Sequence, residues 1–287
     1  MSTTTLITST DPKGIRATSL FQAKYNKAKL DDDRAQRLNE DSEFWTAIGE
    51  LIAKHSRPNQ FASEEVVSRY AYPKEYQGPK PIEVQIKALA EICSIDPASA
   101  LEYAKHLPEL PQGAEGWFAI ISPATTSEAY CLMVNDLLAK LAASRPFTNW
   151  REGQLTPNRF RVHPRTAETL AKLQEIQKGG ILIIAAQFGM LYRGYSTRRA
   201  REKMIGTPQF GLEAVAGISV ALTHPERFVR WEELDIDLPG NEFDPDGDGQ
   251  FVYAPFLDFD GGKLEFDAYR VDYALDYFGS ASGVAPQ

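Results

Sequence analysis

The chain of 287 residues has few cysteines and no apolar run long enough to span a bilayer. Cys93 and Cys131 are isolated, which argues against a disulfide framework and against a cysteine-based zinc site. The longest apolar run, residues 181–186, is far shorter than the roughly 20 residues of a membrane helix. Residues 1–10 have neither the basic start nor the apolar core of a secretory signal. We therefore expect a cytoplasmic protein without a membrane span.

Histidine is also scarce, and none of the four histidines has HxH or HExxH spacing, so a local zinc site is unsupported. His163 and His224 each precede a proline, a pattern typical of a helix start. The sequence around Ser219 approximates a nucleophile elbow but lacks the last glycine and has helical flanks. Ser219 is therefore predicted to be a buried helix serine.

Opposite charges are concentrated in different parts of the chain, whose net charge is −8. Residues 151–205 carry eleven cationic and four acidic side chains, whereas residues 206–287 carry four cationic and sixteen acidic ones. We expect these two segments to neutralise one another in the fold, or else to face different partners. Hydrophobic residues at 43% and charged residues at 24% are typical of a folded globular protein.

The first hundred residues show helical periodicity. Residues 29–55 place apolar side chains at the spacing of one buried helix face, namely at Phe44, Trp45, Ile48, Leu51 and Ile52. Further helices are predicted after residue 63, from residue 81 and after residue 97. Two prolines and two glycines within residues 107–116 then indicate a soft domain boundary.

Strand patterns appear only beyond that boundary. The residues predict strands at 117–121 and 181–186, helices at 127–143 and 166–178, and a hairpin with its turn at 260–262. The fold class is therefore α+β, with a helical N-terminal region followed by a mixed region that has a small sheet and a C-terminal β-hairpin. The domain prediction assigns a flexible N-terminus to 1–20, a helical region to 21–110, a mixed domain to 111–278 and a flexible tail to 279–287.

One acidic loop has the spacing of a calcium site. Asp244, Asp246 and Asp248 alternate, Gly249 stands where such a loop turns, and Gln250 offers a backbone carbonyl. Position 12 of an EF-hand-like loop is Pro255 here, so a closing carboxylate would come from elsewhere. The pattern predicts a structural Ca²⁺ site in preference to Mg²⁺, and the alternative is a solvated acidic turn.

A basic segment follows the apolar run at 181–186. Its start resembles a helix N-terminus, where exposed N–H groups favour anions. It lacks the sequence of a P-loop and of a dinucleotide-binding loop. The candidate anion-binding residues are Arg193, Ser196, Arg198, Arg199 and Arg201. The alternative is a basic helix paired with the acidic C-terminal third of the chain.

The sequence thus favours a binding or structural protein whose calcium loop stabilises the C-terminal β region. One alternative is a phosphate- or nucleic-acid-binding protein, or a Mg-dependent enzyme, that uses the basic helix at residues 193–203. The pI near 5.2 argues against a nucleic-acid partner. Another alternative is a protein-interaction adaptor without a metal site.

Overall fold

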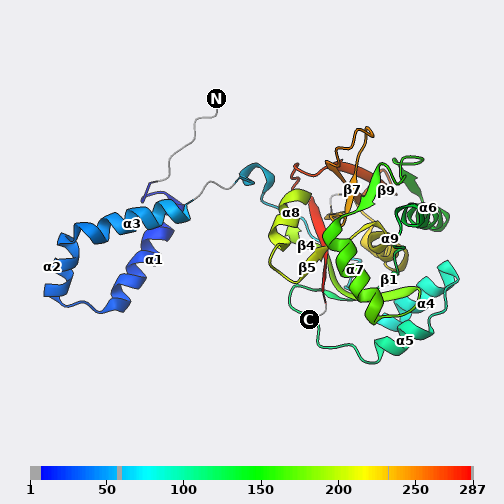
Figure 1. Ribbon diagram of the computed structural model, residues 1–287, viewed down its shortest axis with the longest axis horizontal. Coiled ribbons are helices and arrows are strands. Elements are labelled where there is room, and N and C mark those ends of the chain that lie inside the picture. Colours follow the sequence, from blue (N-terminus) through cyan, green and yellow to red (C-terminus); the bar gives the residue numbers. More distant parts are fainter. Residues whose placement is uncertain (1–7, 57–59, 232, 286–287) are drawn as a thin grey trace. The chain divides into compact units, whose positions relative to one another are not determined.

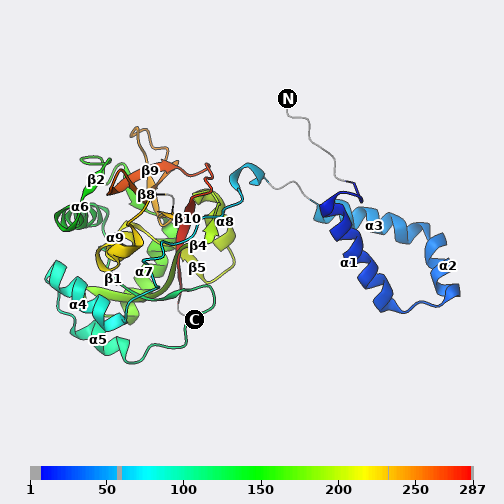
Figure 2. The same ribbon diagram turned by 180° about the vertical axis from the view of Figure 1, so that it is seen from behind.

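The computed structural model describes residues 8–56, 60–231 and 233–285. It divides into two compact units, Met1–Asn59 and Gln60–Gln287, each of which is drawn in Figures 1 and 2. The predicted boundary at residues 107–116 is therefore wrong. Helices that precede it contribute Ile86 and Leu89 to the same hydrophobic core as the strands that follow it, so they belong to the second unit.

The first unit consists of three helices, α1 (Pro12–Ala28), α2 (Asp32–Glu40) and α3 (Ser42–His55). Asp31 and Asp41 cap α2 and α3 by accepting backbone N–H groups. Helix within residues 29–55 is confirmed, but residues 12–20 are helical as well and are not a flexible N-terminus. The predicted buried face of α3 is wrong, because Trp45, Leu51 and Ile52 are all exposed.

The second unit contains six α-helices within the described residues. Their bounds are α4 (Ile82–Cys93), α5 (Ala98–Ala104), α6 (Ser127–Ser144), α7 (Pro164–Ile176), α8 (Thr197–Met204) and α9 (Ala214–Thr223). Two short 3₁₀ helices, η1 (Ala62–Glu64) and η2 (Pro225–Arg227), complete the helical part. His163 directly precedes α7 and His224 directly precedes η2, as predicted from the prolines that follow them. None of the helices in the described part of the chain is long and apolar enough to cross a membrane.

The described strands of the second unit form one mixed ten-stranded sheet. They are β1 (Gly116–Ile121), β2 (Phe147–Asn149), β3 (Phe160–Val162), β4 (Ile181–Arg193), β5 (Gln209–Gly211), β6 (Asp235–Asp237), β7 (Asn241–Phe243), β8 (Tyr253–Asp260), β9 (Lys263–Arg270) and β10 (Phe278–Val284). The main order is β1-β4-β10-β6-β8-β7-β3, with β2 on β9 and β5 on β10. The α+β class and the C-terminal hairpin β8–β9 are confirmed, but the sheet is larger than predicted.

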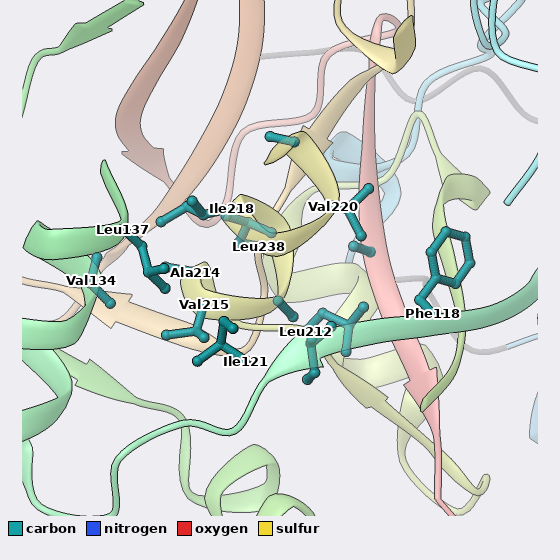
Figure 3. Close-up of a cluster of buried hydrophobic side chains, with 14 of the residues drawn as sticks. Phe118, Ile121, Val134, Leu137, Leu212, Ala214, Val215, Ile218, Val220 and Leu238 are labelled. Atoms are coloured by element: carbon teal, nitrogen blue, oxygen red, sulfur yellow. The ribbon is translucent and has the colours of Figure 1, made fainter. Parts of the chain in front are cut away.

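Helix α9 runs through the middle of the core. Val215, Ile218 and Val220 are fully buried, and the close-up in Figure 3 shows this helix among side chains from α6, β1 and the segment after β5. Ser219 Oγ donates to the carbonyl of Val215 and accepts the N–H of Ile121 at 3.1 Å. Ser219 is therefore the buried helix serine that its flanks predicted, and it ties α9 to β1.

Strand β10 corrects the prediction of a flexible tail at residues 279–287. Residues 279–284 are strand, are buried, and pair with β4, β5 and β6. Small side chains are needed there, because a Cβ at Gly279 would lie 2.3 Å from the carbonyl oxygen of Gly189. A Cβ at Gly283 would lie 2.6 Å from the ring of Phe210. The glycines and serines that suggested flexibility therefore serve close packing.

We expect Gly279→Ala to lower the free energy of unfolding of the second unit by about 2 kcal/mol or more, because the added methyl group meets backbone that cannot move aside. Urea unfolding followed by circular dichroism measures this. Glu175→Ala, at an exposed position of α7 in the same unit, is the control. It should be neutral or slightly stabilising, and an equal loss in both variants would contradict the packing argument.

Candidate functional site

In the predicted calcium loop, the Asp244 carboxylate is turned toward the backbone of its own loop. It accepts N–H groups from Asp246 at 3.1 Å, Gly247 at 2.8 Å and Gly249 at 2.6 Å. Burial raises the pKa of Asp244, but these N–H groups together outweigh it and hold the pKa below its usual value. Asp244 thus acts as the internal cap of this turn.

The other predicted ligands lie at the surface of the same loop. Asp246 and Asp248 are exposed, and Asp248 accepts both the backbone and the side-chain N–H of Gln250 at 3.0 Å. Among the described residues, no group of three or more His, Cys, Asp or Glu side chains is arranged to hold a metal ion. Calcium binding by Asp244, Asp246, Asp248 and Gln250 stays a prediction.

These hydrogen bonds make it possible to test the capping role of Asp244 separately from the predicted calcium binding. We expect Asp244→Ala to lower the melting midpoint by several degrees even with calcium absent, because three backbone N–H groups lose their acceptor. Asp246→Ala is the control and should leave the midpoint unchanged in the same buffer. Differential scanning calorimetry with chelator measures both. Equal midpoints for the two variants would contradict the capping role of Asp244.

The predicted anion-binding residues are bonded to other parts of the second unit. Ser196 Oγ donates to Glu64 at 2.7 Å, and Arg198 forms a two-pronged ion pair with the same carboxylate, with contacts of 2.5 and 3.1 Å. Arg199 pairs with Glu65. The hydrogen-bonded carboxylate partners of Ser196, Arg198 and Arg199 are thus glutamates of the segment before α4, while Asp272 of the C-terminal third adds a weaker electrostatic contribution at Arg198.

The remaining two predicted arginines bind carbonyl groups. Arg201 donates to Pro239 at 2.9 Å and to Asn241 at 2.6 Å, and Arg193 donates to Tyr70 at 3.1 Å. Arg198 and Arg201 do meet in one small pocket, which His163 and Arg165 also line. Burial, and then the charge of Arg201, lower the pKa of His163. Anion binding by these residues stays a prediction.

Pairing between the basic middle segment and the acidic C-terminal segment occurs elsewhere. Arg151 pairs with Asp267, and Arg161 pairs with Glu242 at 2.7 Å. They connect β3, and the turn that follows β2, to strands β7 and β9 of the C-terminal segment. The charge segregation seen in the sequence is therefore partly neutralised within the fold.

A different site brings together carboxylates of β6, β8 and the segment before β6. It is a pocket of about 340 Å³ in the second unit, which we call the acidic pocket. Its acidic lining consists of Glu233, Asp235, Asp258 and Asp260. Its aromatic lining consists of Tyr70, Trp231, Phe259 and Tyr277.

The sheet places the two central carboxylates of the acidic pocket beside each other. Antiparallel β6 and β8 pair Ile236 with Leu257, so the next step of the ladder sets Asp235 opposite Asp258. On its other side β8 pairs Asp258 with Glu265 of β9. Like charges directly opposite one another destabilise a sheet, so this row of carboxylates costs folding free energy.

In the described part of the chain, only the outer member of that row forms an ion pair. Glu265 lies 3.0 Å from Lys263 Nζ and accepts the indole N–H of Trp150 at 2.6 Å. Within the described residues, no ion pair involves Asp235 or Asp258. Buried oxygens of two pocket residues, Asp258 Oδ1 and Glu233 Oε2, have no hydrogen-bond partner there. Such groups are uncommon in folded proteins, because an unpaired buried acceptor loses its hydration without compensation.

These surroundings raise the pKa values of Asp235, Asp258 and Glu233. Burial, with the charges of Glu265 and Asp260 added, raises the pKa of Asp258 to about 7. Burial and the neighbouring Asp258 raise the pKa of Asp235 well above its usual range, although buried Arg227 opposes this. Burial and Glu75 raise the pKa of Glu233. The pocket therefore holds carboxyl groups poised to give up protons to a suitable ligand.

The aromatic side of the acidic pocket is a wall of ring faces and edges. Tyr70 and Tyr277 form an edge-to-face pair with centroids 5.9 Å apart. Trp231 is largely exposed at the rim. Arg145 already lies over the ring of Phe259, with its guanidinium carbon 5.7 Å from the centroid. Ring faces of this kind attract organic cations.

Sequence reasoning missed the acidic pocket. A signal was present, because Asp235 and Asp237, like Asp258 and Asp260, alternate along a strand and so share one face. Strand β6 is only three residues long, however, and its pairing with β8 joins segments about twenty residues apart. A three-residue strand and a pairing between distant segments cannot be recognised as parts of a site from a single sequence.

Comparisons with protein-family models, with curated proteins and with solved structures found no match to this chain.

Proposed function

We propose that this protein is a binding protein for a small organic cation, held in the acidic pocket by carboxylates and aromatic rings. The observation that carries the proposal is the pair of buried oxygens that have no hydrogen bond among the described residues, Asp258 Oδ1 and Glu233 Oε2. Glu233 does lie 3.9 Å from Arg230 through its other oxygen, whereas no ion pair of the described residues involves Asp258. An ammonium or guanidinium group supplies the N–H donors that both oxygens lack, and it also supplies a positive charge beside Asp258.

The chemistry of the lining favours an organic cation over a metal ion. Aromatic faces do not ligate hard metals, which take oxygen ligands, but they do stabilise ammonium and guanidinium groups. The pocket volume of about 340 Å³ lies at the lower end of the range for small-molecule sites. A ligand with one or two cationic groups on a short carbon chain fits these properties.

The direct test is calorimetric titration of the full chain with three probes, agmatine, spermidine and choline, which carry a guanidinium group, several ammonium groups and a quaternary ammonium group. We expect at least one probe to bind. Asp258→Asn and Glu233→Gln should each weaken that binding about tenfold or more, because a charged hydrogen-bond acceptor is lost.

Asp246→Asn, which removes a carboxylate from an exposed loop outside the pocket, is the matched control and should bind like the wild type. If none of the three probes binds, or if the control weakens binding as much as the pocket variants do, the proposed function is wrong. The readout of all these titrations is the heat of binding.

The raised pKa of Asp258 makes the free energy of unfolding depend on pH. The pKa of Asp258 is about 7 in the fold and roughly 3.9 in an unfolded chain. Between these values the unfolded chain releases the proton while the folded protein keeps it. This contribution to stability is therefore full below the lower pKa and is lost as pH rises through about 7.

We expect Asp258→Asn, which cannot ionise, to remove this loss, so that the variant gains on the order of 1 to 2 kcal/mol relative to the wild type at pH 8 compared with pH 4. Urea unfolding across that pH range measures the difference. A constant difference between variant and wild type at every pH would show that Asp258 ionises normally in the fold.

A further inference from the structure

The helices of the first unit expose their apolar side chains instead of burying them. Ile52 is 62% exposed, Leu51 is 50% exposed and Leu20 is 61% exposed. Phe21 and Trp45 do contact each other, with ring centroids 6.4 Å apart, so α1 and α3 touch within one chain. Across the described residues of this unit, however, no side chain in the three helices is buried.

A unit of this size needs further stabilisation. Isolated helices of 9 to 17 residues, the lengths of α1 to α3, are marginal in water. Small domains without a sufficient core usually depend on a disulfide, a metal or association with another chain. Both cysteines lie in the second unit, and no metal-holding group occurs among the described residues. Association is the remaining source of stability.

The charges of the first unit are complementary to those of a second copy of the same unit. Helix α1 carries four cations, Lys13, Arg16, Lys24 and Lys27, and no acidic residue. Residues 31–55, which include α2 and α3, carry seven acidic and three cationic side chains. The net charges are therefore +4 and −4. The ion pairs described in this unit, Arg34 with Asp31 and Arg37 with Asp33, both lie at α2.

The cations of α1 thus have no ion pair among the described residues, although a matching acidic surface exists in the same unit. A two-fold axis brings the same two surfaces together twice, because each copy presents to its partner what the partner presents to it. We propose that the first unit is a dimerisation module, in which the cationic α1 and the apolar face of α3 pair with the acidic α2–α3 segment and the apolar face of a second copy.

The proposal is tested by sedimentation equilibrium of the full chain across the micromolar range. The wild type should be dimeric. Leu51→Ser together with Ile52→Ser should weaken the dimer roughly tenfold or more, since both side chains are largely exposed in the single chain and would be buried only in the dimer. Leu132→Ser together with Ile176→Ser, at exposed apolar positions of the second unit, is the matched control. It should leave the dimer intact.

Charge reversal separates a second copy from any other partner. Changing Lys13, Arg16, Lys24 and Lys27 to Glu reverses the net charge of α1 from +4 to −4, and changing Asp32, Glu40, Glu43 and Glu50 to Lys reverses that of residues 31–55 from −4 to +4. Each of these two proteins alone should be monomeric. An equal mixture of these two proteins should sediment as a dimer, because each reversed surface then meets a reversed partner. Far-UV circular dichroism of each variant checks that the helices persist.

A wild type that remains monomeric throughout the micromolar range would overturn the proposal. The exposed apolar face would then be a binding surface for a different protein. A mixture that stays monomeric while both variants are helical would overturn it as well. So would loss of the dimer in the Leu132 and Ile176 control but not in the Leu51 and Ile52 variant.

Discussion

The second unit depends on the close backbone approach that β10 makes to its neighbours. This strand pairs antiparallel with β4 and β5 and parallel with β6. Gly279 packs so tightly against Gly189 that a Cβ at Gly279 would lie 2.3 Å from the carbonyl oxygen of Gly189. Strand β6 has only three residues, and its parallel register with β10 pairs Phe278 with Asp235. The location of Asp235 therefore follows from a packing constraint on glycine.

In the acidic pocket, the sheet contains a row of neighbouring carboxylates that lowers the free energy of unfolding. A sheet that holds Asp235 opposite Asp258, with Glu265 next in the row, accepts repulsion that an uncharged residue would remove. The fold relieves part of the cost by keeping carboxyl groups protonated, as the raised pKa of Asp258 indicates. Sites that break a local rule in this way are frequently functional. An organic cation would replace the protons and pair the carboxylates.

The two units obtain their stability differently. The second unit has a continuous core around α9 and the central strands, as seen in Figure 3. The first unit has apolar residues at the right helical spacing but no buried side chain among those described. Pairing between two copies would complete its core, and it would also give the protein two acidic pockets per assembly.

The sequence predicted the parts of the fold that periodicity controls. The helix at 127–144, the strand that begins at Ile181 and the hairpin turn at 260–262 have long or strongly alternating patterns, and they appear in the structure. Periodicity did not show that the face with Trp45 and Ile52 is exposed, because an apolar stripe looks the same whether its partner lies within the chain or outside it. The glycine- and serine-rich strand at 278–284 was mistaken for a tail, since composition does not distinguish flexibility from close approach.

The candidate site was predictable only in its residue types. The acidic character of residues 206–287 is evident in the sequence. The regular spacing of carboxylates, however, points to the compact loop at Asp244, whose carboxylate accepts the loop's own N–H groups. The pocket carboxylates come from β6, β8 and the segment before β6, and long-range strand pairing brings them together. Such pairing depends on the whole sheet, which three-residue strands do not reveal in a single sequence.

The most direct measurement is an NMR titration of the side-chain carboxyl carbons of Asp235 and Asp258, with and without the organic cation that binds in calorimetry. The account predicts that at least one of the two carboxyls titrates near neutral pH in the free protein, and that the bound cation lowers its pKa. If both carboxyls titrate in the ordinary acidic range and the cation leaves them unchanged, the pocket does not hold poised carboxyl groups and the account is contradicted.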